Sequence, residues 1–233
     1  MTFVFHMKGE FKSLLKTVEV IHNPNNLPID RAVIWLHGLG ANGHDFEPVV
    51  PDLGLDGNHG VRFVFPHAPA IPVTINQGYV MPAWYDILEM SLERKIDTAQ
   101  IEQSARAIGE LIAREAERGV SPAHIVIAGF SQGGAVAYQT ALSYEKPLAG
   151  LLTLSTYLAT KDSLTLSDAN KNLNIAIHHG TQDPVVPVQL GQEAKAWLES
   201  KGYQPQFYSY PMAHQVCMPQ LKIIGKWLND VLA

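Results

Sequence analysis

The chain has 233 residues, of which 46% are hydrophobic and 17% charged, and its formal net charge is −5. This composition excludes disordered and collagen-like chains, because so many apolar side chains can bury a large core. No segment concentrates Lys and Arg as a nucleic-acid-binding surface would, so nucleic acid is not expected as a partner. The length suits one α/β domain, and we expect residues 1–233 to form a single domain.

Two features of the sequence bear on where the protein acts. Cys217 is the single cysteine and cannot form an internal disulfide, so nothing requires an oxidising compartment. The start of the chain lacks the features of a signal peptide, and the longest nearly apolar stretch, residues 148–159, is too short and too polar to span a bilayer. We therefore expect a soluble, cytoplasmic protein without a transmembrane segment.

Short apolar runs rich in β-forming residues alternate with longer helical patterns, which predicts βαβ units and a mostly parallel sheet. Strands are predicted at residues 17–21, 32–36, 62–65, 124–128, 150–154, 175–178 and 206–210. Helices are predicted at residues 97–118, 131–143, 187–201 and 221–232. The first helix has the clearest signals, because Asp97 and Gln100 match a capping box and Gly119 provides a stop.

Residues 68–90 follow neither the helical nor the strand period and contain three prolines and Gly78. A connection this long is uncommon inside a compact domain and is usually functional or disordered. Its many aromatic and aliphatic side chains favour a loop packed over a site.

The segment Gly129-Phe130-Ser131-Gln132-Gly133 matches the G-x-S-x-G nucleophile elbow, in which a sharp strand-to-helix turn presents the serine hydroxyl. The pattern alone is weak in a chain rich in glycine and serine. A predicted strand directly before it and small residues at the start of the next helix strengthen it. The alternative is a glycine-rich turn that carries an ordinary serine.

A serine nucleophile needs a general base, and the base needs an acid that fixes its tautomer. After Ser131 the chain offers His178, His179 and His214. The first two lie on a predicted strand, where adjacent side chains face opposite ways, and a structural role suits both. His214 follows a strand on a loop, at the sheet edge where ligands bind in open α/β sheets, and is the predicted base.

Asp183 is the predicted acid, because it also follows a strand and precedes the residues that punctuate the next helix. A turn-forming Asp before proline and a solvated loop His are the alternatives for this pair. Acyl transfer also needs donors for the oxyanion, and we predict the backbone N–H groups of Gln132 and Leu39. For the loop containing Leu39, the alternative is a glycine-rich turn with a buried His37.

Six motifs in order resemble the carboxylesterases and acyl-protein thioesterases of the phospholipase/carboxylesterase group of α/β-hydrolases. The resemblance covers about residues 33–232. Its motifs are His37-Gly38-Leu39-Gly40, Pro66-His67-Ala68-Pro69, Trp84-Tyr85-Asp86, Gly129-Phe130-Ser131-Gln132-Gly133-Gly134, Gly180-x-x-Asp183-x-x-Val186 and Tyr210-Pro211-Met212-Ala213-His214.

The resemblance implies an α/β-hydrolase fold without a large cap domain, with a mostly parallel sheet flanked by helices. It implies a Ser131, Asp183 and His214 triad, oxyanion donors at Leu39 and Gln132, and hydrolysis of ester or thioester bonds. Neither a metal nor a cofactor is expected, and the sequence contains no H-E-x-x-H motif, no paired-cysteine spacing and no phosphate-binding loop.

The resemblance also implies an acyl groove bordered by loops, and we expect Ile75, Met81, Trp84 and Tyr85 to contribute to it. For the two aromatic residues the alternative is packing alone. Carboxylic esters of small to medium acyl groups, lysophospholipids and acylated proteins all remain open as substrates. A non-catalytic binding protein on the same fold is the alternative from a different class. Exposed apolar loop residues make a homodimer a further expectation.

The sequence departs from the family pattern near the predicted base. Ala213 stands where family members usually have glycine, so we expect the local turn to differ. Gln215 and Cys217 replace residues that are more often acidic or aliphatic. Cys217 is not expected to be a nucleophile, because no elbow surrounds it. Asp86 precedes Ser131 and is expected to hold its loop by hydrogen bonds.

Overall fold

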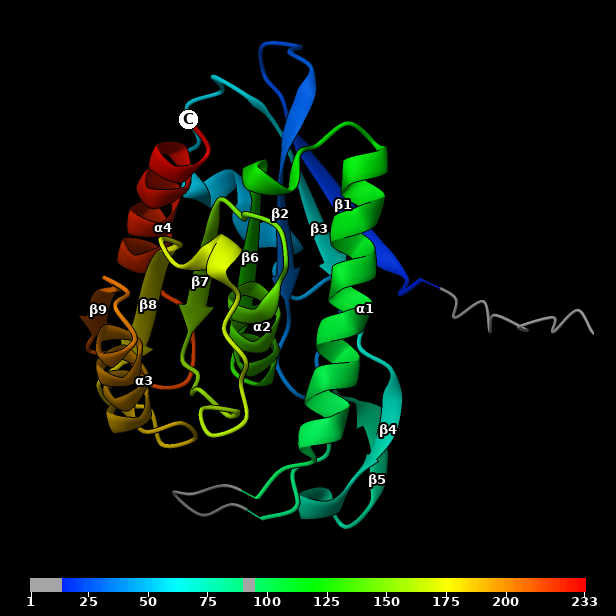
Figure 1. The fold of residues 1–233 in the computed structure, drawn as a ribbon, viewed down its shortest axis with the longest axis vertical. Coiled ribbons are helices and arrows are strands. Elements are labelled where there is room, and N and C mark those ends of the chain that lie inside the picture. Colours follow the sequence, from blue (N-terminus) through cyan, green and yellow to red (C-terminus); the bar gives the residue numbers. More distant parts are fainter. Residues whose placement is uncertain (1–13, 90–94) are drawn as a thin grey trace, which may run out of the picture.

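The computed structural model describes residues 14–89 and 95–233, and within them a seven-stranded sheet forms the centre of the molecule (Figure 1). The strands lie in the order β1-β3-β2-β6-β7-β8-β9. Only the β1–β3 pair is antiparallel among the described strands of this sheet, so the predicted mostly parallel sheet is confirmed. Their bounds are β1 (Thr17–His22), β2 (Ile29–Leu36), β3 (Gly60–Pro66), β6 (Ile125–Phe130), β7 (Gly150–Leu154), β8 (Asn174–Gly180) and β9 (Gln206–Tyr210).

All four predicted helices are present, each within three residues of its predicted bounds. They are α1 (Thr98–Glu117), α2 (Gln132–Ser143), α3 (Val188–Ser200) and α4 (Met218–Val231). The structure adds short 3₁₀ helices that the sequence analysis did not predict, among them η1 (Glu47–Leu53) between β2 and β3. Two prolines in its seven residues hide any helical period, because proline lacks the backbone N–H that a helix uses.

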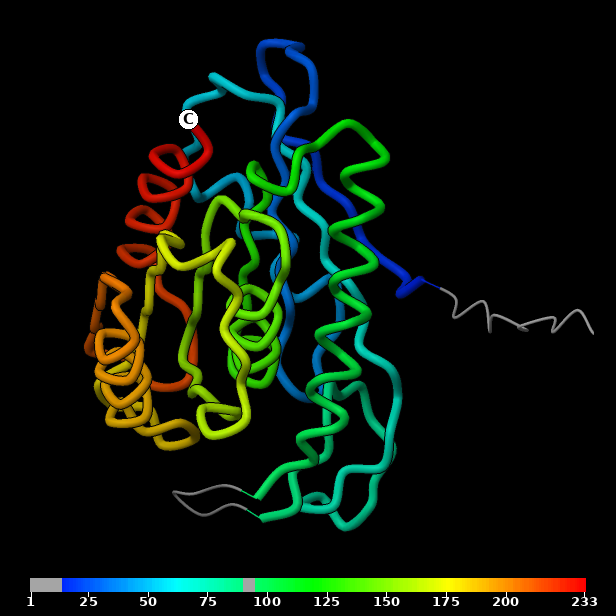
Figure 2. The backbone as a smooth tube through the Cα atoms, in the orientation of Figure 1, coloured from blue at the N-terminus to red at the C-terminus, as the bar shows by residue number. Residues whose placement is uncertain are grey.

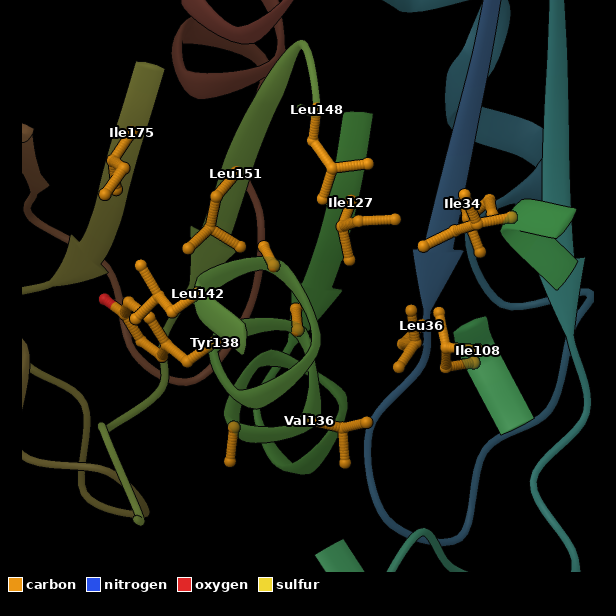
Figure 3. Close-up of a cluster of buried hydrophobic side chains, with 14 of the residues drawn as sticks. Ile34, Leu36, Ile108, Ile127, Val136, Tyr138, Leu142, Leu148, Leu151 and Ile175 are labelled. Carbon is orange, nitrogen blue, oxygen red and sulfur yellow. The ribbon is translucent and has the colours of Figure 1, made fainter. Parts of the chain in front are cut away.

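The core divides into two layers because side chains alternate along each buried strand. Ile34 of β2 belongs to a cluster with side chains of α1, α2 and α3, whereas Trp35 belongs to a cluster with α4 and η1. Figure 3 shows Ile127 and Leu151 from strands together with Leu142 of α2 in the first cluster. Helices therefore cover both faces of the sheet and leave its carboxyl edge to the loops.

The expectation of an irregular loop at residues 68–90 was wrong for its central part. Residues of β4 (Ala70–Val73) and β5 (Tyr79–Pro82) pair in an antiparallel ribbon, which Figure 2 shows at the end of the molecule where α1 begins. The 3₁₀ turn η2 (Thr74–Asn76) joins them, followed by Gln77 and Gly78 at positive φ. Strands of four residues that each contain a proline give no clear alternation, and an isolated ribbon tolerates them. Residue 90 lies outside the described residues.

Hydrogen bonds fasten this ribbon to the rest of the fold. Asp86 accepts from the backbone N–H of Thr74 at 2.7 Å and from its hydroxyl at 2.6 Å, which is the predicted loop-holding role. Asp97 caps α1 through the N–H of Gln100 at 3.0 Å. The Gln100 side chain, however, accepts from the Asp86 N–H at 2.7 Å, so only half of the predicted capping box forms and the other half links α1 to the ribbon.

A buried carboxylate joins α1 to the antiparallel edge of the sheet. Glu115 is fully buried and pairs with Arg62 of β3 and with Arg114 and Arg118 of its own helical end. Glu19 of β1 pairs with the same two arginines of the helix at 2.8 and 3.0 Å. These contacts satisfy charges that would otherwise be costly to bury.

No helix among the described residues is long and apolar enough to cross a membrane.

Replacing Glu115 tests the importance of this network. Glu115→Ala removes the hydrogen-bonded partner of the buried Arg62 guanidinium and leaves it only the longer contact with Glu19, at 3.8 Å, so we expect the free energy of unfolding to fall by about 3–5 kcal/mol. Glu102→Ala is the matched control, because its pair with Arg106 on the same helix is exposed, and we expect less than about 1 kcal/mol. Urea unfolding measures both losses of free energy. Equal losses would contradict the larger contribution to stability expected of the buried ion pair.

Candidate active site

Ser131 occupies a tight turn between β6 and α2. Its backbone has φ 53° and ψ −120°, a strained conformation for a residue with a side chain. The turn brings α2 so close to its neighbours that a Cβ on Gly133 would lie 2.5 Å from the carbonyl oxygen of His37. A Cβ on Gly134 would lie 2.5 Å from Cγ2 of Thr156. Glycine at these positions is therefore a requirement of the close approach.

The end of β7 holds this turn from the side. The N–H of Ser131 donates to the carbonyl oxygen of Leu154 at 2.9 Å, and the hydroxyl of Thr156 donates to the carbonyl oxygen of Ser131 at 2.6 Å. Ser155 between them also has a positive φ of 46°. The backbone of Ser131 is thus fixed by two hydrogen bonds, as well as by the packing of the glycines that follow it.

The structure brings the three predicted triad residues together. Nε2 of His214 lies 3.0 Å from Oγ of Ser131, and Nδ1 lies 2.7 Å from Oδ2 of Asp183. Asp183 follows β8 and His214 follows β9, so both come from loops at the carboxyl edge of the sheet. With Nδ1 donating to the carboxylate, Nε2 is free to accept the serine proton.

The surroundings of Asp183 keep it ionised. Burial raises the pKa of this carboxyl, but the hydrogen bond from His214 and those from backbone N–H groups outweigh burial and hold the pKa below its ordinary value. These backbone donors are Val185 at 2.9 Å and Val186 at 2.8 Å, both to Oδ1. One oxygen is thus bound by the loop, and the other is left to orient the imidazole.

The other two candidate histidines do not reach Ser131. His178 is buried beside Tyr210, whose hydroxyl lies 2.9 Å from its Nδ1, and burial lowers its pKa to about 3. His179 is also buried, and its Nε2 lies 2.7 Å from the carbonyl oxygen of Val186. These contacts confirm the structural role predicted for both.

His37 shapes the loop that contains Leu39. Its Nε2 accepts from the N–H of Ala68 at 3.1 Å, so Nδ1 carries the proton and donates to the carbonyl oxygen of Gly38 at 2.7 Å. Burial lowers the pKa of His37 to about 4, which favours this neutral form. A turn with a buried His37, the alternative for this loop, is therefore present, and it places Leu39 beside Ser131 in the lining of one cavity.

Gln132 has a side-chain role that the sequence analysis missed. Its Oε1 accepts from the backbone N–H of Trp84 at 2.8 Å, and its Nε2 donates to the carbonyl oxygen of Tyr85 at 2.7 Å. The residue that follows the serine thus fixes the segment after β5. An amide at the buried start of a helix was the signal, because a buried amide must find both a donor and an acceptor.

A cavity of about 260 Å³ opens at Ser131. Of the four residues expected in a groove, Ile75 and Tyr85 line it, but Trp84 and Met81 do not. Trp84 is only 1% exposed, and its indole N–H donates to the carbonyl oxygen of His37, so it supports the site from beneath. The lining consists of Gly38, Leu39, Ala41, Asp45, Ile75, Tyr85, Ile87, Phe130, Ser131, Gln132, Tyr157, Val185 and His214.

The departures from the family pattern leave the site geometry intact. Ala213 is exposed and does not have a positive φ, so its methyl group fits the turn before His214. Cys217 does not line the cavity, and its N–H donates to Gln220 at the start of α4. Within residues 14–89 and 95–233, no three His, Cys, Asp or Glu side chains are grouped so that they could hold a metal ion.

Comparison with known proteins places this geometry in a family. A family model described as Phospholipase/Carboxylesterase matches residues 16–232. The chain belongs to the phospholipase/carboxylesterase family. It is therefore a hydrolase of the α/β-hydrolase type, as the motifs implied.

Proteins similar to this chain over most of its length include two acyl-protein thioesterases. Acyl-protein thioesterase 1 of Neurospora crassa is 37% identical over 214 residues, which are 86% of this chain and 86% of that protein. The crystal structure of Arabidopsis thaliana SOBER1 has a TM-score of 0.81 at 30% identity and covers 87% of this chain and 99% of its own. That of Zea mays acyl-protein thioesterase 2 has a TM-score of 0.80 at 25% identity and covers 93% and 99%.

The lowered pKa of His37 predicts acid destabilisation. The unfolded chain binds a proton at this residue near pH 6.5, whereas the folded chain binds it only near pH 4. The contribution of neutral His37 to the free energy of unfolding is therefore fully present above pH 6.5. It is lost as the pH falls toward 4, by about 3 kcal/mol at 1.36 kcal/mol per pKa unit.

Urea unfolding at a series of pH values between 7 and 4.5 measures this decline. His178 contributes in the same direction, because burial also lowers its pKa. His37→Gln keeps an acceptor for the N–H of Ala68 but cannot titrate, so we expect a shallower dependence on pH. An unchanged dependence in this variant would contradict the assignment of the buried neutral form.

Proposed function

We propose that this chain hydrolyses carboxylic esters and thioesters through an acyl-enzyme on Ser131. The observation that carries the proposal is the continuous hydrogen-bond chain from Ser131 Oγ through His214 to Asp183, with distances of 3.0 and 2.7 Å. The matches to acyl-protein thioesterases and the family membership support the same reaction class.

The reaction begins when His214 takes the proton of the Ser131 hydroxyl through Nε2. Oγ attacks the carbonyl carbon, and the backbone N–H groups of Leu39 and Gln132 bind the oxyanion, each contributing about 2.7–4 kcal/mol. His214 then gives its proton to the departing alcohol or thiol. Water attacks the acyl-enzyme by the same route, which releases the acid and restores Ser131. Asp183 stabilises the imidazolium formed in each half.

The size and the apolar lining of the cavity support acyl groups of small to medium length as the bound part of the substrate. Leu39, Ile75, Ile87 and Val185 give it an apolar wall, and a phenol pair with a 2.8 Å hydrogen bond, Tyr85 and Tyr157, contributes polar atoms. An acylated protein is a proposed substrate, supported by the similarity to acyl-protein thioesterases 1 and 2. A lysophospholipid is the alternative with the same chemistry.

A homodimer and a cytoplasmic location are two further parts of the proposal. Tyr79 and Val80 of β5 are 70% and 55% exposed, which supports the expected homodimer. Light scattering of the purified protein tests it. A cytoplasmic location stays a prediction from the single cysteine.

Removing the nucleophile tests the mechanism. We expect Ser131→Ala to lose at least about 10³-fold in kcat toward a p-nitrophenyl ester, because no acyl-enzyme can form. The substitution removes only the hydroxyl and keeps the Cβ, and the backbone hydrogen bonds of residue 131 do not involve that hydroxyl, so circular dichroism should show a folded protein. A fluorophosphonate should label the unaltered chain stoichiometrically at Ser131 and should not label the variant. A folded, unaltered chain that neither reacts with the probe nor hydrolyses esters would favour the non-catalytic binding protein.

Acyl length and leaving group define the substrate class. Each methylene buried in the apolar cavity contributes about 0.8 kcal/mol, so we expect kcat/KM to rise up to about fourfold per methylene until the cavity is full. A series of p-nitrophenyl esters from C2 to C12 measures this rise. The matching acyl-CoA series compares thioesters at equal chain length. A rate independent of chain length would show that the cavity does not bind the acyl group.

A further inference from the structure

Asp45 places a carboxylate in the wall of the active-site cavity. It lies in the loop after β2, and among the described residues of the lining it is the only acidic one. The same lining includes the aliphatic side chains of Leu39, Ile75 and Val185. Asp45 is an exposed residue, so its carboxylate lies at the solvent-facing edge of this lining.

The fold gives this carboxylate no structural task. Within the described part of the chain, the Asp45 side chain makes no hydrogen bond or ion pair, and only its backbone N–H is engaged, with Asn42. The adjacent helix η1 begins without a side-chain cap, so Asp45 does not serve there. The neighbouring His44 contacts Glu47, at 2.7 Å, and makes no ion pair with Asp45.

The electrostatics of the cavity favour a positive partner for Asp45. Partial burial raises the pKa of its carboxyl, and no nearby donor offsets this effect. A cationic group of a ligand bound in the cavity would be attracted by this carboxylate, with the strength of a partly exposed ion pair. The net charge of −5 attracts the same ligands from a distance.

We propose that Asp45 selects for ester or thioester substrates that carry a cationic group, such as a quaternary ammonium, and against anionic ones. The proposal rests on the proposed hydrolase function and deepens it. The carboxylate would contact the charged part of the substrate while Ser131 attacks the carbonyl group. Selection then depends on one charge, so a neutral isostere of the same shape reveals it.

The experiment uses two pairs of substrates that differ only in one atom, nitrogen or carbon. Butyrylcholine and 3,3-dimethylbutyl butyrate place the charge on the alcohol. The p-nitrophenyl esters of 4-(trimethylammonio)butyrate and 5,5-dimethylhexanoate place it on the acyl group. The readout is the ratio of kcat/KM for the cationic and the neutral member, in which any general loss of activity cancels.

We expect Asp45→Asn to lower this ratio by about 3- to 10-fold in at least one pair, the range of a partly exposed ion pair. The difference between the two proteins should shrink in 0.5 M NaCl, because salt screens such a pair. The pair that responds shows which side of the substrate meets Asp45. Asp45→Glu keeps the charge and should keep the preference.

Asp52→Asn is the matched control, because it removes the same charge from η1, away from the cavity lining, and should leave the ratio unchanged. Equal ratios for the unaltered chain and Asp45→Asn in both pairs would overturn the inference. Hydrolysis of the neutral esters by the unaltered chain shows that the hydrolase function stands in that case. Failure to hydrolyse any of the four would instead overturn the proposed function.

Discussion

The close approach of α2 to β2, β6 and β7 is the constraint on which this site depends. Ser131 can take its strained conformation only because Gly133 and Gly134 let the helix pack against His37 and Thr156. Any side chain at these glycines would push the helix away and carry the serine with it. The same contacts point the serine hydroxyl toward the loops at the carboxyl edge of the sheet, where Asp183 is anchored by its own loop.

The segment after β5 is held by polar groups that also belong to the site. Trp84 binds Gln132 through its backbone and His37 through its indole, so the two loops proposed to supply oxyanion donors share one support. Tyr85 is fixed from the same amide of Gln132. A buried network of this kind rigidifies its members when every group is satisfied. The position of the cavity wall and the position of the proposed oxyanion donors are therefore set together.

Sequence patterns predicted what local residues decide. The seven strands were found as short apolar runs rich in β-forming residues and the four helices as longer runs with a helical period, and the triad candidates followed from strand ends and chain order. The β4–β5 ribbon was missed because four-residue strands with prolines have no period. The cavity lining was only half foreseen, since Asp45 and Tyr157 come from distant loops whose meeting is a matter of packing. Trp84 and Tyr85 are adjacent, yet only Tyr85 faces the cavity, and no pattern distinguishes them.

The hydrogen bond between Tyr85 and Tyr157 joins two stretches of chain that are anchored independently, one to Gln132 and one to the end of β7. A single neutral bond of this kind contributes only about 0.5–1.5 kcal/mol, far less than the packing on either side of it. The two margins of the cavity wall are therefore held mainly by their own anchors, and the phenol pair ties these two separate parts of the fold together at the cavity.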